Sequence, residues 1–434
     1  MKKQKSVGLL AQKTTVTNKN VGTITIEGTG SAGIYGSDNS TISNEGTITA
    51  KETGSAGIYS DNSNAENKAS GVITAEKGTS AGIYAKVKDA KSIQNVGTIN
   101  VGTAANTTDT QGAGIYGEVV SGGTGVLAIG NTSNINIDLN GSVGIFAKNG
   151  TGSAGNLTVS NTGTITAKKE NSVGILSEKS TVTSSGTVTL QGKTSVGIFG
   201  KNDSEITNKK NIVISSEDSA GMYASDSNAT NDENAKITIN GSSGATSGSA
   251  GMYGKLSKAS TSNYTILNKG AIEIESVTKN VGIYGEVEKS ATSKLTLQND
   301  KDINIAAGSK QSVGMFAVND EDNDKDKLEV VNNDNITAKS EESIGISAQK
   351  STVKNAGTIT MEDKKSAGIY GSKGSKVTNE KEIEIKEEKS AGIYLEDSDA
   401  VNAENAKITV HKGESAGIYG KFTSGSKADN TIEN

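Results

Sequence analysis

The chain has 434 residues, of which 53 are Gly, and it contains a single His and no Pro, Cys, Trp or Arg. This composition excludes disulfides, thiolate metal sites, histidine clusters and catalysis by a Cys–His pair. The 44 basic residues against 49 acidic residues give a net charge of -5 without a sustained basic block. That balance argues against nucleic acid as the main partner.

The N-terminal residues 1–5 are mostly basic, but the apolar stretch that follows, residues 7–11, is too short for the core of a signal peptide. No apolar run approaches the roughly 18 residues that a membrane span requires. We therefore expect no secretion signal in this chain and no membrane insertion by this segment.

A short phrase, Ser-Ala/Val-Gly-Ile/Met-Tyr/Phe, recurs through almost the whole chain. Its glycine occupies sixteen positions spaced 23 to 32 residues apart: Gly8, Gly33, Gly57, Gly82, Gly114, Gly144, Gly174, Gly197, Gly221, Gly251, Gly282, Gly314, Gly345, Gly368, Gly392 and Gly417. The text around Gly8 repeats around Gly174 and again around Gly345, so six units form one higher-order block. These repeats predict a single β-solenoid over residues 1–434, with blocks 6–171, 172–342 and 343–434, the last incomplete.

Each unit contains three short runs in which apolar residues alternate with small or polar ones. In the unit at residue 31 these runs are residues 31–36, 40–44 and 46–50, separated by Gly, Asn, Asp and Lys. Each run predicts a strand, and a unit of this length leaves no room for a crossover helix. We predict an all-β, three-sided, right-handed parallel β-helix of about 16 rungs. The absence of Pro follows, because Pro in a strand between two neighbours removes a ladder hydrogen bond.

An asparagine column accompanies the third strand of the units. The Asn lies four residues before the first Ile of that strand at Asn20, Asn44, Asn95, Asn131, Asn161, Asn208, Asn268, Asn299, Asn332, Asn355 and Asn379. Asn67, Asn234 and Asn405 occupy a shifted position, and Ser184 replaces the Asn once. Stacked amides at one corner predict a structural asparagine ladder.

An aromatic column accompanies the repeat phrase, and 13 of the 15 Tyr and Phe residues belong to it. They lie two residues after the repeat glycine: Tyr35, Tyr59, Tyr84, Tyr116, Phe146, Phe199, Tyr223, Tyr253, Tyr284, Phe316, Tyr370, Tyr394 and Tyr419. The first unit of each block carries Leu10, Leu176 or Ser347 instead. The column is therefore a candidate aromatic binding face that is interrupted once in every block.

The direction of the aromatic column follows from strand alternation. We assign the Ala or Val before the glycine and the Ile or Met after it to the core. The aromatic residue then shares the outer face with Ser and Gly, as an apolar surface suited to stacking or to being covered. An inward stack that only fills the core, or an outward stack that only stabilises itself, are the alternatives.

Several units are longer, and they add their residues mostly between the first two strands, as at residues 117–129 and 254–267. These Ser-, Lys- and Gly-rich insertions are expected at the corner beside the aromatic column. Solenoids generally vary their insertions on the face that they use.

We predict no catalytic site, no metal site and no cofactor. The acidic residues Asp320, Asp322, Asp324 and Asp326 resemble the start of a calcium loop, but the sixth position is Lys and the EF-hand pattern fails. A second acidic group, Glu396, Asp397 and Asp399, could suggest the paired carboxylates of a glycosidase. Similar residues recur in the matching unit of the second block, which favours architecture over catalysis.

The phrases SAGIYG, NSVGIF and N-x-G-T-I-T, in a chain rich in Lys and Asn, resemble the passenger domains of very large fusobacterial type V autotransporter adhesins. The resemblance covers essentially the whole chain. It implies a β-helical stalk on the bacterial cell surface, exposed outside the outer membrane, that attaches to other bacteria or to host cells. The secretion signal and the C-terminal barrel of that family are not in this chain, so we expect further β-helix rungs at both ends of the full-length protein.

The function expected from the resemblance is non-enzymatic attachment, with a host-cell or bacterial surface glycan or protein as receptor. Repeated weak sites along the aromatic face would act through multivalency. A β-helical enzyme that processes polysaccharides is one alternative. A structural spacer without a ligand is the other.

Overall fold

The computed structural model describes residues 5–103, 109–241, 248–275, 278–320, 322–423 and 431–434. The chain forms two compact units, residues 1–212 and 213–434. Each described unit is built of strands, and the second also contains the short 3-10 helix η1 (Lys325–Lys327). The division between the units lies inside the second block of the sequence repeat.

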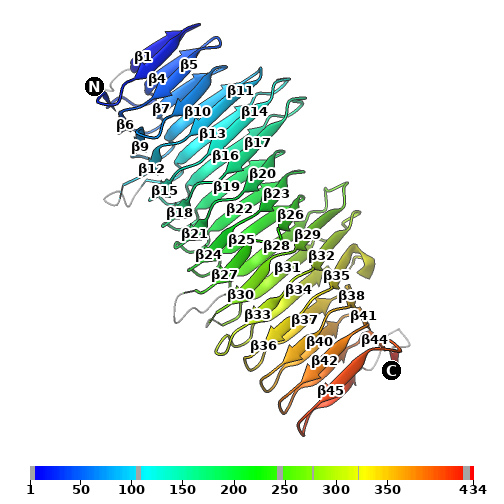
Figure 1. Cartoon of the computed structure of the whole chain (residues 1–434). Coiled ribbons are helices and arrows are strands. Elements are labelled where there is room, and N and C mark those ends of the chain that lie inside the picture. Colours follow the sequence, from blue (N-terminus) through cyan, green and yellow to red (C-terminus); the bar gives the residue numbers. More distant parts are fainter. Residues whose placement is uncertain (1–4, 104–108, 242–247, 276–277, 321, 424–430) are drawn as a thin grey trace. The chain divides into compact units, whose positions relative to one another are not determined.

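The strands take three positions in a regular order, and one strand of each position makes a rung. Among the residues that the structure describes, sixteen strands take the first position (sheet A), sixteen the second (sheet B) and fifteen the third (sheet C). Strands of the same position are parallel neighbours, so β4 (Ala32–Ser37) pairs with β7 (Ala56–Asp61), and β7 with β10 (Ala81–Val87). Figure 1 shows these strands side by side near the N-terminus. The predicted all-β, three-sided parallel β-helix of about 16 rungs is confirmed.

The strands of the first unit have the following bounds. Sheet A contains β1 (Val7–Gln12), β4, β7, β10, β13 (Ala113–Val119), β16 (Val143–Asn149), β19 (Val173–Glu178) and β22 (Val196–Lys201). Sheet B contains β2 (Thr15–Asn18), β5 (Thr41–Asn44), β8 (Asn64–Asn67), β11 (Lys91–Asn95), β14 (Leu127–Asn131), β17 (Leu157–Asn161), β20 (Thr181–Ser184) and β23 (Glu205–Asn208). Sheet C contains β3 (Thr23–Ile26), β6 (Thr47–Ala50), β9 (Val72–Ala75), β12 (Thr98–Val101), β15 (Ile135–Ile137), β18 (Ile165–Ala167) and β21 (Val188–Leu190). One further sheet-C strand, β24 (Asn211–Ile214), contains the division between the units.

The strands of the second unit continue the same order. Sheet A contains β25 (Ala220–Ser225), β28 (Ala250–Leu256), β31 (Val281–Val287), β34 (Val313–Asn319), β37 (Ile344–Gln349), β40 (Ala367–Ser372), β43 (Ala391–Glu396) and β46 (Ala416–Lys421). Sheet B contains β26 (Asn228–Asn231), β29 (Tyr264–Asn268), β32 (Leu295–Asn299), β35 (Leu328–Asn332), β38 (Thr352–Asn355), β41 (Lys376–Asn379), β44 (Asp399–Asn402) and β47 (Ile432–Glu433). Sheet C contains β27 (Lys236–Ile239), β30 (Ala271–Ile274), β33 (Ile303–Ile305), β36 (Ile336–Ala338), β39 (Ile359–Met361), β42 (Glu382–Ile385) and β45 (Lys407–Val410).

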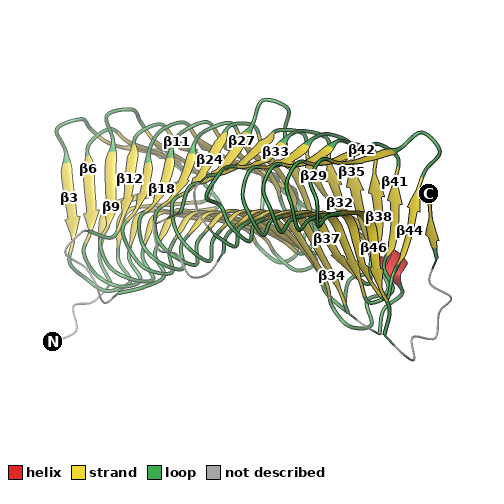
Figure 2. Ribbon diagram, turned by 90° about the horizontal axis from the view of Figure 1, so that it is seen from below, coloured by secondary structure: helices red, strands yellow, loops and turns green. Residues whose placement is uncertain are grey.

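The core of a rung is formed by apolar side chains from all three sheets. Ile34 of sheet A, Ile42 of sheet B and Ile48 of sheet C are all fully buried. Each lies in register with an apolar residue of the next rung, as Ile34 does with Ile58. The same columns repeat through the described rungs, so burial is achieved by stacking and not by any single rung. Figure 2 shows sheet-C strands β3, β6, β9 and β12 side by side, with the loops gathered at the corners.

The repeat glycine is required by close packing at the start of most sheet-A strands. A Cβ atom on Gly33 would lie 2.5 Å from the carbonyl oxygen of Gly57 and 2.6 Å from Cγ2 of Ile48, which belongs to the core. Ala32 and Ile34 each have a register partner in the next rung, whereas Gly33 has none. The glycine thus forms a local bulge that faces inward and reverses the alternation before it.

This bulge corrects two assignments made from simple alternation. Ala32 was expected in the core with Ile34; it is buried, but on the outer side of the sheet, where it lines a groove together with Tyr35. Gly33 was expected on the outer face, but it faces the core. Period-two alternation fails here because two consecutive residues, Gly33 and Ile34, lie on the inner side of the bulge.

Candidate functional site

The aromatic column lies on the outer face of sheet A. Twelve of its thirteen members are half-buried and Tyr419 is exposed, whereas the Ile or Met directly before each ring is buried in all rungs but the last. Register pairs join the members, for example Tyr84 with Tyr116 and Tyr253 with Tyr284. The parallel register therefore places each ring beside the ring of the next rung.

Neighbouring rings contact one another along the column. In the first unit the ring centroids of Tyr35 and Tyr59 are 5.3 Å apart, those of Tyr59 and Tyr84 4.9 Å, and those of Tyr84 and Tyr116 4.7 Å, all in stacked arrangement. Phe146 meets Tyr116 edge-on at 5.2 Å. Such pairs stabilise the sheet beyond the burial of their area, by about 0.5–1.5 kcal/mol each.

The column is broken at the first rung of a block, as the sequence indicates. Leu176 lies in register between Phe146 and Phe199, and Ser347 lies between Phe316 and Tyr370. The rings that follow Ser347 contact one another again, in a tilted arrangement, with 5.6 Å between the centroids of Tyr370 and Tyr394. The aromatic face is therefore a series of short stacks.

The phenol groups donate hydrogen bonds to a neighbouring row of carboxylates. Tyr253 Oη is 2.6 Å from Glu286 Oε2, and Tyr370 Oη is 2.7 Å from Glu396 Oε2. Burial, reinforced by the bond to Glu396, raises the pKa of Tyr370 to about 12. Burial also raises the pKa of Tyr253, and the bond to Glu286 adds to that effect. The phenols thus stay protonated donors at neutral pH.

The carboxylate row also alternates with lysines. Glu118 lies between Lys86 and Lys148, at 3.9 and 3.7 Å from their Nζ atoms. Glu286 and Lys255 pair at 3.6 Å in the second unit. Charges of opposite sign therefore face each other across adjacent rungs, and each such partly exposed pair contributes little to stability, about 0–1 kcal/mol.

Within the described residues, two grooves beside the rings have the residue before the repeat glycine in their floor. One groove, of about 790 Å³, is lined among others by Ala367, Ala391, Ala416, Tyr370, Tyr394 and Tyr419. The other, of about 530 Å³, is lined among others by Ala32, Ala56, Ala81, Tyr35, Tyr59 and Tyr84. These are equivalent residues of the second to fourth rungs in the third and first blocks. The same hollow therefore recurs at equivalent rungs of the first and third blocks.

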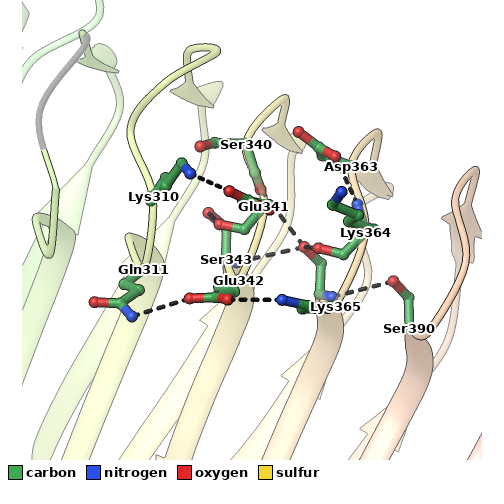
Figure 3. Close-up of polar contacts among 11 residues, drawn as sticks. Lys310, Gln311, Ser340, Glu341, Glu342, Ser343, Asp363, Lys364, Lys365 and Ser390 are labelled. Carbon is green, nitrogen blue, oxygen red and sulfur yellow. Dashed lines mark hydrogen bonds and ion pairs between the residues drawn. The ribbon is translucent and has the colours of Figure 1, made fainter.

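The second wall of the larger groove is the turn that precedes each sheet-A strand. Glu342 accepts a hydrogen bond from Gln311 at 3.0 Å and pairs with Lys365 at 3.3 Å. Lys310 and Glu341 pair in the adjacent row, and Figure 3 shows both rows directed along the stack. Glu342 and Lys365 adopt left-handed backbone conformations with φ of 58° and 56°. The same turn shape in successive rungs lets each charged side chain reach the next.

Buried serines tie these turns together. Ser366 Oγ accepts a hydrogen bond from the Ser343 amide at 3.3 Å, and Ser390 Oγ accepts one from the Ser366 amide at 3.0 Å. Figure 3 shows Ser343 and Ser390 beside the charged residues. The first Ser of the repeat phrase was expected on the outer face beside the ring. It is buried instead, because the turn leaves a backbone amide that its hydroxyl satisfies.

A second serine row lies at the corner between sheets A and B in the short units. Ser63 Oγ accepts from the Ser40 amide at 3.0 Å, and Ser398 Oγ accepts from the Ser375 amide at 3.1 Å. Sequence reasoning missed both serine rows. The signal for the first row was present, since a Ser stands two residues before the repeat glycine in most units.

The asparagine ladder lies at the corner between sheets B and C, with 2.7–3.0 Å between donor and acceptor atoms of successive side chains. In the first unit its members are Asn18, Asn44, Asn67, Asn95, Asn131, Asn161 and Ser184. In the second unit they are Asn231, Asn268, Asn299, Asn332, Asn355, Asn379, Asn402 and Asn434. Asn208 ends β23 at the equivalent position, in register with Ser184, and is fully buried.

Three predicted members of the ladder are wrong. Asn20, Asn234 and Asn405 are exposed, and the ladder positions of their rungs belong to Asn18, Asn231 and Asn402. In these rungs the turn after sheet B is two residues longer. Counting back from the sheet-C Ile therefore stops inside the turn, whereas the ladder residue is the last residue of the sheet-B strand.

The acidic groups have structural partners. Asp324 caps η1 by accepting from the Asp326 amide, and Asp322 pairs with Lys289. Asp397 accepts from the amide and hydroxyl of Thr423, both at 2.7 Å. Across the described ranges, no group of three or more His, Asp or Glu residues is placed to hold a metal ion.

The insertions of the longer units lie where they were expected, at the corner between sheets A and B. They join β13 to β14 and β28 to β29, and the flanking strands are longer than in short units, with seven and five residues. Val287 and Asn319 of such corners line a further hollow together with Tyr284. The insertions therefore stand beside the aromatic column.

Comparison with known proteins gives no assignment. No model of a known protein family matches the chain, and no curated protein matches it. In the part of the chain that the structure describes, no helix has the length and apolar character needed to cross a membrane.

Proposed function

We propose that the chain is a segment of the β-helical stalk of a non-enzymatic bacterial surface adhesin. In this proposal the segment is exposed outside the outer membrane and attaches the cell to other bacteria or to host cells. The motif resemblance supplies the class of protein. The observation that carries the proposal is the repetition of one outer surface, the aromatic groove, at equivalent rungs of two blocks.

Repetition favours attachment over catalysis for a physical reason. A catalytic site needs one arrangement of groups held against one substrate. An attachment surface gains from weak sites that recur, because the second contact forms at high effective concentration once the first is made. The column of Tyr35, Tyr59 and Tyr84, and that of Tyr370, Tyr394 and Tyr419, provide such a recurrence within one chain.

The receptor in this proposal is a glycan or protein on a host or bacterial surface. Beads coated with the purified chain should attach to epithelial cells or to bacteria in greater number than beads coated with serum albumin. Equal attachment of the two kinds of bead would contradict the adhesive role and favour a spacer. Release of reducing ends from polysaccharides by the purified chain would contradict the non-enzymatic role.

The proposed location has its own test. An antibody raised against the chain should label intact cells of the bacterium that produces it. Labelling that appears only after the outer membrane is permeabilised would contradict exposure at the cell surface.

A further inference from the structure

We propose that the two grooves beside the aromatic stacks bind an uncharged linear glycan lying along the stacking direction. This inference rests on the proposed adhesive function and names the ligand class of its site. It is carried by what the two grooves share, by how their charges are arranged, and by the spacing of their rungs.

The lining shared by the two grooves is uncharged. Both contain alanines in the floor, the hydroxyl-bearing rings of three tyrosines, and serines at the preceding turn. The turn positions differ, because Gly30 and Gly54 stand in one groove where Lys365 and Lys389 stand in the other. Consecutive rings lie against one another, stacked in one groove and tilted in the other, so a ligand meets ring edges, phenol groups and methyl groups. That mixture of apolar and hydroxyl groups matches the CH and OH groups of a sugar.

The charges of the larger groove are already paired with one another. Lys365 pairs with Glu342 at 3.3 Å, and Lys389 with Glu414 at 3.6 Å. Glu396 pairs with Lys421 at 3.7 Å and also accepts from Tyr370. An anionic or cationic ligand would have to separate these ion pairs. A neutral ligand can instead form hydrogen bonds with the solvent-facing atoms of the paired side chains.

The groove offers little to a peptide or an acyl chain. Peptides that add to sheets use free backbone groups at an edge, but the floor strands β40 and β43 are paired on both sides. An acyl chain would place its apolar surface against the charged rim formed by Lys365 and Lys389. A linear glycan meets neither difficulty.

The repeat distance of the groove also suits such a chain. The floor alanines follow one another at the spacing of parallel strands, about 4.8 Å. Consecutive ring centroids lie 5.3 and 4.9 Å apart in one groove and 5.6 and 5.1 Å apart in the other. One pyranose unit of an extended glycan is close to this length, so successive sugars can meet successive rungs in the same way.

The chain itself suggests a variant that fills the grooves without changing the fold. At the floor position other rungs carry Val, as in Val143 and Val313, and these rungs keep the same register. Ala56→Val together with Ala391→Val therefore blocks the centre of each groove with a side chain that the architecture already accepts. Ala250→Val adds the same methyl groups at a floor position outside both grooves and serves as the matched control.

The test measures binding of short neutral oligosaccharides of hexose and N-acetylhexosamine units to the immobilised full chain. The unchanged chain and the control should bind at least one of them, and the filled variant should bind at least about tenfold more weakly with an unchanged melting temperature. Loss of affinity in the control as well, equal affinity in the filled variant, or preference for a sulfated saccharide or a fatty acid would overturn the inference.

A second measurement needs no variant. The chain has no Trp, so its fluorescence comes from the tyrosines, and the bound oligosaccharide should change it. Absence of both binding and a fluorescence change over the whole panel overturns the glycan groove. Attachment of coated beads to cells despite that result would leave the adhesive function standing, so the two failures are distinguishable.

Discussion

Replacing Asn355 by Ala should cost several kcal/mol, because its side chain makes three buried hydrogen bonds. It accepts from Asn332 Nδ2 at 2.8 Å, and it donates to Asn379 Oδ1 at 2.8 Å and to the Gly357 carbonyl at 2.9 Å. At a net value of about 1 kcal/mol each, the bonds contribute about 3 kcal/mol. Asn332 and Asn379 are fully buried and would be left with unpaired groups, which raises the expected cost to about 3–5 kcal/mol.

The matched control is Asn20→Ala. Asn20 stands near the ladder in the sequence, but it is exposed, so its replacement should change the free energy by less than about 0.5 kcal/mol. Asn355→Ser should fall between the two, because Ser184 holds a ladder position and accepts from Asn161 at 3.0 Å.

Amide hydrogen exchange followed by mass spectrometry is the suitable assay, because a solenoid can open locally without unfolding as a whole. Peptides that cover β38 and β41 should lose protection in the Asn355→Ala variant, and their opening free energy should fall by the amount given above. Equal protection in the Asn355→Ala and Asn20→Ala variants would refute the reasoning that the ladder stabilises the corner.

Three further predictions concern the turn, the bulge and the phenols. Gly368→Ala should destabilise the chain by about 1–3 kcal/mol in urea unfolding, since its new methyl group would lie 2.6 Å from both the Gly392 carbonyl oxygen and Ile383 Cγ2. Gly413→Ala, with open space around it, should cost less, and equal costs would contradict the bulge. Ser366→Ala leaves a buried amide unpaired and should cost about 1–3 kcal/mol in the same assay, so an unchanged midpoint would contradict the serine row. The raised pKa of Tyr370 favours the protonated phenol in the folded state, so its contribution is complete below pH 10 and is lost between pH 10 and about 12. The Tyr370→Phe variant should lack that part of the alkaline loss in a urea series at increasing pH, and an identical pH profile would contradict it.

The period of the sequence repeat predicted the rungs because every rung needs the same kinds of residue at the same positions. The three runs of the unit at residue 31 became β4, β5 and β6, with bounds within one residue of the expected ones. Because the same core position must be filled in every rung, an apolar residue recurs at the same place in every repeat unit. Constant spacing therefore identifies the stacked columns even without knowledge of the backbone.

The wrong predictions of ladder and core residues arose where a longer turn or a bulge changes the number of residues between two structural positions. The longer turn after Asn18 moved the ladder position away from Asn20, and the bulge at Gly33 moved Ala32 from the core to the groove. Neither feature changes the period of the repeat, so the period could not show them. The grooves also depended on the three-dimensional form, because only the structure brings Ala391 and Tyr394 together along one hollow.

Disulfide trapping in the second unit tests whether adjacent strands stack in parallel and in register. The chain has no Cys, so Thr378→Cys with Val401→Cys introduces a single pair, in register on adjacent sheet-B strands. We expect rapid disulfide formation in this pair under mild oxidation, because registered neighbours about 4.8 Å apart satisfy the geometry of the bond. Thr378→Cys with Asp399→Cys is offset by two residues, about 8 Å apart, and should remain reduced. A disulfide in the offset pair but not in the registered pair would contradict the stacking on which the ladder, the aromatic column and the grooves depend.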